Sequence, residues 1–116
     1  MMNSAEEDFV RAAAAFKTGH GAEGAELLRR AAFAGHAEAQ NQLARIYFAQ
    51  TKRREDLGAL ESAALQGDHV ALFVLAMCLL EGRLCDRDSD KALAALRRAA
   101  LAGNRMAASM LGGQQA

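Results

Sequence analysis

Apolar residues recur along this chain at the three- and four-residue spacing of amphipathic helices. Two stripes of this kind are Leu57, Leu60, Ala63 and Ala64, and then Leu93, Leu96, Ala99 and Ala100. Glycines separate the stripes, and glycine can end a helix because it adopts the left-handed backbone without strain from a β-carbon. The pattern predicts helices at about residues 4–18, 22–34, 37–49, 55–66, 69–81, 89–102 and 105–112.

The composition favours the same fold class. Alanine and leucine dominate, β-branched residues are few and proline is absent, so helix formers greatly outnumber strand formers. Hydrophobic residues make up 52% of the 116 positions and aromatic residues only 5%, which is enough for a core built from small side chains. We therefore expect an all-α fold in a single domain over residues 1–116.

The chain also repeats itself. An Ala-Ala pair followed by glycine occurs in the blocks 31–39, 63–71 and 99–107. Each period contains two expected helices, and a helix pair of this length cannot bury its own apolar stripe, so neighbouring pairs must stack. The sequence predicts an αα-solenoid, a right-handed superhelix of helix pairs. Its units would be residues 4–35, 36–67 and 68–103, with a C-terminal half-unit at 104–113.

The third block resembles Sel1-like repeats, which are relatives of the tetratricopeptide repeat. The residues that carry the resemblance are Ala71, Leu75, Ala76, Leu79, Gly82, Cys85, Asp88, Lys91, Ala92, Ala99, Ala100 and Gly103. The match is specific over residues 68–103 and weaker over 9–112. Leu79 replaces an aromatic residue of the family pattern, Leu84 its second loop glycine and Cys85 its valine.

This resemblance implies a protein-binding groove lined by the first helix of each pair. Carried onto the matched positions, it gives the partner-binding residues Glu38, Asn41, Arg45, Phe48, Val70, Phe73, Met77 and Leu80. The helix at 69–81 is apolar around most of its circumference, so something should cover it. Two explanations stay open: neighbouring helices bury Phe73 and Met77, or a partner helix, a peptide or a second copy of the chain covers them.

We find no recognisable catalytic or metal-binding motif. His36 and His69 lie at expected helix starts, which favours turn or capping roles, and the histidines and cysteines do not cluster as zinc ligands do. Cys78 and Cys85 are seven positions apart, but small apolar roles as free thiols are favoured over a bridge or a metal pair. No serine or cysteine stands in a nucleophile motif. We expect no cofactor, no metal and no enzymatic activity.

Charge and hydropathy limit the classes of partner. The formal net charge is zero, and the basic pairs are interrupted on the expected outer helices, so we expect no nucleic acid. The longest apolar run, residues 70–80, is too short to cross a bilayer, so we expect no membrane. The acidic start does not resemble a secretory signal, and the two cysteines do not indicate a disulfide scaffold. A cytoplasmic location is expected.

The expected function follows from the resemblance. Sel1-like proteins are mostly adaptors and scaffolds, and some are immunity proteins against secreted toxins. We therefore expect a small bacterial-type adaptor or inhibitor that binds a protein partner and that can also form a homodimer. The alternative is an enzyme or ligand binder, because some Sel1-like proteins are linked to β-lactam or peptidoglycan recognition. Fold-level analogy gives only a prior on function.

Overall fold

The computed structural model describes residues 2–112, and within that range the chain is helical without β-strands. The helices are α1 (Ser4–Lys17), α2 (Gly21–Phe33), α3 (Ala37–Gln50), α4 (Asp56–Leu65), α5 (His69–Glu81), α6 (Ser89–Leu101) and α7 (Arg105–Gly112). Every expected helix is present, with each end within one residue of its expected position. The all-α fold class is confirmed. The expected end of the last half-unit, residue 113, lies outside the described residues.

Side-chain caps and left-handed glycines explain where the helices begin and end. His36, Asp68 and Asn104 occupy equivalent positions in the repeated turns, and each side chain accepts a hydrogen bond from a backbone amide of the helix that follows. Asp88 caps α6 in the same way, as its sequence context predicts. The glycines before the repeated caps have φ values between 96° and 106°, which only glycine adopts without strain. They are Gly35, Gly67 and Gly103.

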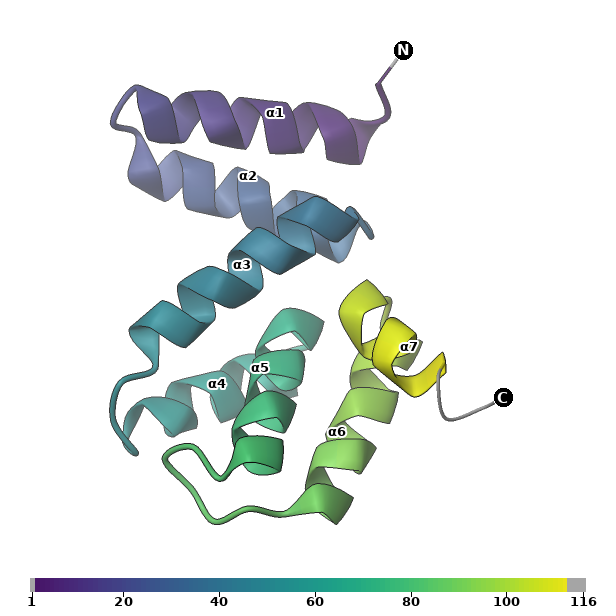
Figure 1. Ribbon diagram of the computed structural model, residues 1–116. Coiled ribbons are helices and arrows are strands. Elements are labelled where there is room, and N and C mark those ends of the chain that lie inside the picture. The colour runs from purple at the N-terminus through teal and green to yellow at the C-terminus, as the bar shows by residue number, and fades with distance from the viewer. Residues whose placement is uncertain (1, 113–116) are drawn as a thin grey trace.

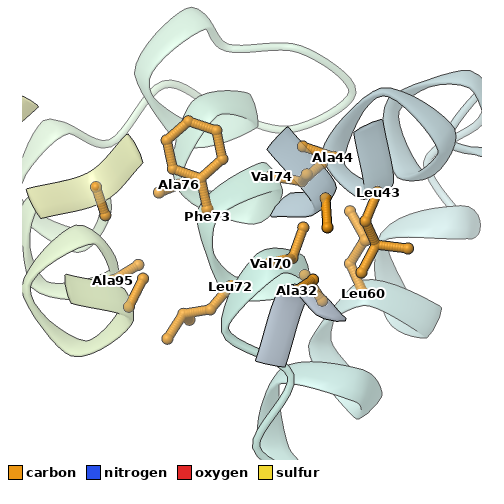
Figure 2. Packing of buried hydrophobic residues seen from close by; sticks show 14 of the residues in the cluster. Ala32, Leu43, Ala44, Leu60, Val70, Leu72, Phe73, Val74, Ala76 and Ala95 are labelled. Atoms are coloured by element: carbon orange, nitrogen blue, oxygen red, sulfur yellow. The ribbon is translucent and has the colours of Figure 1, made fainter. Parts of the chain in front are cut away.

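The helices form a flattened body of 40 × 36 × 20 Å. α1 lies along α2 and α5 lies along α6, while α3 runs between these pairs and packs on α2, α5 and α7 (Figure 1). α5 is the central helix, with most of its side chains buried. Val70 and Val74 lie on the side of Leu43, whereas Leu72 lies toward Ala95 of α6 (Figure 2). The core therefore forms around the most apolar helix of the sequence.

α3 and α7 are in contact although they are far apart in the sequence. A simple stack of helix pairs joins only neighbouring units, yet the buried Gln40 of α3 reaches the turn before α7. Its Nε2 donates to the carbonyl oxygens of Ala32 and Gly103, at 2.9 and 3.0 Å, and its Oε1 accepts from the amide of Arg105 at 2.8 Å. The Arg105 guanidinium also donates to the Gly35 carbonyl at 3.3 Å. Two helices from non-adjacent units of the expected repeat are therefore in contact.

The loop between α5 and α6 has two residues with a left-handed backbone. Gly82 ends α5 with a φ of 69°, and Leu84 has a φ of 64° although it carries a side chain. Leu84 stands where the Sel1-like pattern has its second glycine. A left-handed leucine costs on the order of 1 kcal/mol or more. The half-buried side chain of Leu84 packs against the core, and this contact offsets the strain.

Candidate functional site

A hollow of about 700 Å³ lies between α3, α5 and α7. Its apolar lining comes from Phe73, Met106 and Met110, together with Ala37. Its polar lining comes from Glu38, Asn41, Arg105 and Ser109. Each polar side chain is exposed, whereas Phe73 is buried and Met106 half-buried. The hollow therefore has an apolar floor and a polar rim.

A second hollow, of about 490 Å³, continues the first toward the start of α1. The two share Ala37, Glu38 and Arg105, and the second extends past His36 to Glu6. We call this continuous depression the α3–α7 groove. Its carboxylates and the Arg105 guanidinium give the rim charges of both signs. The His36 ring stacks on Phe9, with centroids 4.5 Å apart, and so is held against α1.

The structure brings three of the expected partner-binding residues to the groove. Glu38 and Asn41 line it from α3, one turn apart, and Phe73 lines it from α5. Arg45 is exposed farther along α3, outside the lining. Partner binding by these residues stays a prediction.

The four expected partner-binding residues of α5, Val70, Phe73, Met77 and Leu80, do not form one exposed stripe. Val70 has no exposed surface, so its assignment to a partner-binding surface is corrected: it packs against α3 inside the core. Phe73 is 7% exposed and belongs mainly to the core, while Met77 and Leu80 are half-buried. Of the two explanations left open by the sequence, burial by neighbouring helices accounts for Val70 and for most of Phe73.

Phe48 has a partner within the chain. The Arg83 guanidinium lies 5.9 Å from the centroid of the Phe48 ring, in a cation–π arrangement. Arg83 also donates to the Thr51 carbonyl at 3.1 Å. Phe48 is therefore half-covered by the loop after α5 and lies outside the α3–α7 groove.

A buried polar cluster fixes the start of α5 against α3. The Tyr47 hydroxyl donates to Asp68 Oδ2 at 2.5 Å, while Asp68 Oδ1 accepts the amides of Val70 and Ala71. Burial, and then the hydrogen bond to Asp68, raise the pKa of Tyr47 to about 12. Tyr47 therefore remains a neutral hydrogen-bond donor.

His69 joins α5 to the turn before α7. Asn104 Oδ1 accepts the amide of Ala107, so its Nδ2 faces His69 Nδ1, 3.3 Å away, and donates to it. Burial lowers the pKa of His69, and the Asp68 carboxylate opposes this change only in part. The histidine is therefore held in its neutral form. Its Nε2 has no hydrogen-bond partner among residues 2–112.

The groove holds little that could perform covalent chemistry. Among the described residues that line the first hollow, Ser109 has the only hydroxyl, and neither histidine nor cysteine is present. His36 borders the adjoining hollow, but its Nδ1 accepts the Ala39 amide at 3.1 Å. Within the described part of the chain, no three His, Cys, Asp or Glu side chains are grouped to hold a metal ion.

The cysteines lie away from the groove. Cys78 is buried in the core, where burial raises the pKa of its thiol. Cys85 is half-buried, and its Sγ donates to the Cys78 carbonyl at 3.6 Å. Their persistence as free thiols stays a prediction.

Met106 and Ser109 of α7, which the resemblance also places on the groove, line the hollow. Sequence reasoning missed Arg105 and Met110 of α7 and Ala37 of α3, which line it as well. The signal that could have pointed to more was Gln40, a polar residue on a helix face that turns toward the core.

Comparisons of this chain with family models, with curated proteins and with solved structures found no match. No helix among residues 2–112 has both the length and the apolar character needed to cross a membrane.

Proposed function

We propose that this protein is a non-catalytic module that binds a partner protein, as a helix or an extended peptide, in the α3–α7 groove. The observation that carries the proposal is the apolar floor of Phe73, Met106 and Met110 inside a polar rim. Protein interfaces commonly have this arrangement of an apolar centre and a polar edge. Because the groove continues into a second hollow, an elongated segment fits it better than a compact small molecule.

The proposal includes a solenoid of Sel1-like type. Its support is the recurrence of the same local structure: a left-handed glycine, a capping side chain, and then an alanine with no exposed surface three residues after the cap. The alanines are Ala39, Ala71 and Ala107. The α3–α7 contact makes this a stack that curls, so that α7 forms one wall of the groove instead of only covering the last helix pair.

The proposed biological role is that of an adaptor or inhibitor, including an immunity protein against a secreted toxin, which acts by occupying a surface of its partner. The rim supports selective binding, because Glu38 of α3 and Arg105 of α7 place opposite charges on it. The absence of a histidine or cysteine beside Ser109, among the described lining residues, supports a binding role over acyl-transfer chemistry.

A peptide-display selection tests the proposal. Peptides selected on the wild-type protein would be titrated against Ser109→Trp, in which the indole fills the hollow from α7. Because Ser109 is exposed, this change leaves the core intact. We expect binding to weaken by about tenfold or more, which corresponds to about 1.4 kcal/mol.

The matched control is Ser62→Trp, at an exposed serine of α4 outside the groove. This variant should bind the same peptides with wild-type affinity. Peptides that bind all three proteins equally, or a selection that yields no binder sensitive to Ser109→Trp, would contradict the proposed function.

A further inference from the structure

The helices α2, α4 and α6 each end in a large apolar residue at the same position of the repeat: Phe33, Leu65 and Leu101. Phe33 is covered in part, because its ring packs 5.6 Å from that of His69. Leu65 and Leu101 are 83% and 90% exposed. A single exposed leucine is ordinary on a protein surface. Two almost uncovered leucines at equivalent ends of neighbouring units make a surface that nothing within the described chain covers.

A small hollow of about 110 Å³ separates the ends of α4 and α6. Ala64 borders it from α4, Arg98 from α6, Ala102 from the turn after α6, and His69 and Leu72 from α5. Leu65 directly follows Ala64 and Leu101 directly precedes Ala102, so each exposed leucine is the sequence neighbour of a residue that borders the hollow. Its volume is far below the roughly 300–1,000 Å³ of small-molecule pockets, and fits an aliphatic side chain better than a ligand.

The charges beside the leucines are complementary. Glu61 lies one helical turn before Leu65, and Arg97 lies one turn before Leu101. Both are exposed, and neither forms an ion pair within residues 2–112. We call the surface formed by Glu61, Leu65, Arg97 and Leu101 the leucine edge.

We propose that a second copy of this chain covers the leucine edge, in a dimer with two-fold symmetry. A two-fold axis beside the hollow exchanges the α4 end of one copy with the α6 end of the other. Leu65 of each copy then lies against Leu101 of the other, over the hollow, and Glu61 of each faces Arg97 of the other. The leucine edge of each copy thus supplies both members of the apolar pair, Leu65 and Leu101, and both members of the ion pair, Glu61 and Arg97.

Two further observations favour a second copy over a different protein. A partner with one dominant charge would meet an unfavourable charge at either Glu61 or Arg97, whereas a second copy supplies the complement of both. The net charge of the chain is zero, so no long-range repulsion opposes the approach of two copies. The leucine edge shares no lining residue with the α3–α7 groove, so the dimer does not depend on the proposed function.

The pairing is weak, because the leucine edge is small. Standard interfaces bury about 800 Å² on each partner, and two leucines with their rim supply only a fraction of this area. We expect a dissociation constant on the order of 100 µM.

Sedimentation velocity tests the dimer on the full chain, over concentrations from about 10 µM to about 1 mM. The wild-type protein should show a concentration-dependent shift toward the dimer. Leu101→Glu should remain monomeric through this range while its far-ultraviolet circular dichroism is unchanged, because Leu101 is 90% exposed. Val10→Glu places the same substitution type at an apolar residue of α1 that is 50% exposed, and should dimerise as the wild type does.

A charge exchange tests the two-fold geometry. Glu61→Arg and Arg97→Glu, each alone, place like charges opposite one another and should weaken dimerisation at low salt by about threefold or more. The double variant restores opposite charges in the reversed order, and should recover wild-type dimerisation. A wild-type protein that stays monomeric at about 1 mM would overturn the proposal, as would dimerisation unaffected by Leu101→Glu, or a double variant no better than the single variants.

Discussion

His69 is a buried histidine whose surroundings favour the neutral form, because burial lowers its pKa. Its Nδ1 accepts a hydrogen bond from the Asn104 amide group, whose orientation is fixed because Oδ1 caps α7. A proton on Nδ1 would face that donor, and the positive charge would lie in a site that is 4% exposed. Asp68 is the nearest compensating charge, but its oxygens are already engaged by the α5 amides and by Tyr47.

We expect stability to fall as the pH is lowered below about 6.5. The pKa of His69 in the folded protein lies below its reference value of 6.5, so between these two pKa values the unfolded chain binds more protons. The contribution of neutral His69 to the free energy of unfolding is complete at pH values above the reference pKa, and it is lost as the pH falls toward the pKa of His69 in the folded protein. Urea unfolding at about pH 7.5 and about pH 5 measures this difference.

The variant His69→Leu should make the free energy of unfolding less dependent on pH over this interval, because it removes the titrating group. His20→Leu is the control, since His20 is exposed at the end of α1. An unchanged pH dependence in His69→Leu would show that other groups are responsible.

Phe73 lines the α3–α7 groove but is mainly a core residue. It is 7% exposed, so Phe73→Ala removes a buried ring and leaves a cavity. We expect the free energy of unfolding to fall by about 3 kcal/mol. Met110→Ala, at a residue that is 41% exposed in the same hollow, should change stability by less than about 0.5 kcal/mol. Chemical denaturation of both variants checks this, and equal losses would contradict the assignment of Phe73 to the core.

At the scale of helices and turns, replacing glycine by alanine should have opposite effects on stability in a turn and within a helix. Gly103 has a φ of 106° between α6 and α7, whereas Gly58 is exposed inside α4 with no atom near the position of an added β-carbon. Gly103→Ala should therefore lower the free energy of unfolding by about 1–2 kcal/mol, through backbone strain. Gly58→Ala should raise it by about 0.5–1 kcal/mol, through helix propensity. Parallel thermal or urea melts compare the two, and a stabilising Gly103→Ala would contradict the role given to the turn.

The helices were predictable because their signals are local. The left-handed glycine, the capping side chain and the apolar stripe all lie within a few residues of the boundary they define, as at Gly67, Asp68 and Val70. The groove was predictable where its lining follows the repeat, at Glu38 and Asn41 of α3 and at Phe73 of α5. The burial of Val70 was not, because a helix that is apolar on every side gives no periodicity to separate its core face from an exposed face.

The arrangement of the whole molecule depends on a contact between residues far apart in the chain. Gln40 and Arg105 are 65 positions apart, and no spacing within the repeat indicates that they meet. Gln40 has no exposed surface, and its amide group joins the last turn of α2 to the turn before α7 through the carbonyl oxygens of Ala32 and Gly103. This contact places α7 as a wall of the groove.

Gln40→Leu should release α7 while the rest of the fold persists. Leucine has a similar size but leaves the Arg105 amide and the Gly103 carbonyl without their partner, whereas the Ala32 carbonyl keeps the Gly35 amide at 3.1 Å. Each unsatisfied group costs about 1–3 kcal/mol when it stays buried. Opening α7 exposes these groups to water, so this route is favoured over global unfolding. We expect a loss of about 3 kcal/mol in stability. Hydrogen exchange should quicken first at the amides of α7, while those of α1 and α2 keep their protection.

Gln42→Leu is the matched control, because Gln42 lies two positions away on the same helix and is exposed. It should change stability by less than about 0.5 kcal/mol and leave the exchange of α7 unchanged. If Gln40→Leu destabilised all helices equally, α7 would unfold together with the rest of the protein, and the idea that α7 can detach on its own would be contradicted. If exchange quickens only in α7, the packing of α7 against α3 completes the groove. Peptides that bind the groove should then slow hydrogen exchange in α7 of the wild-type protein.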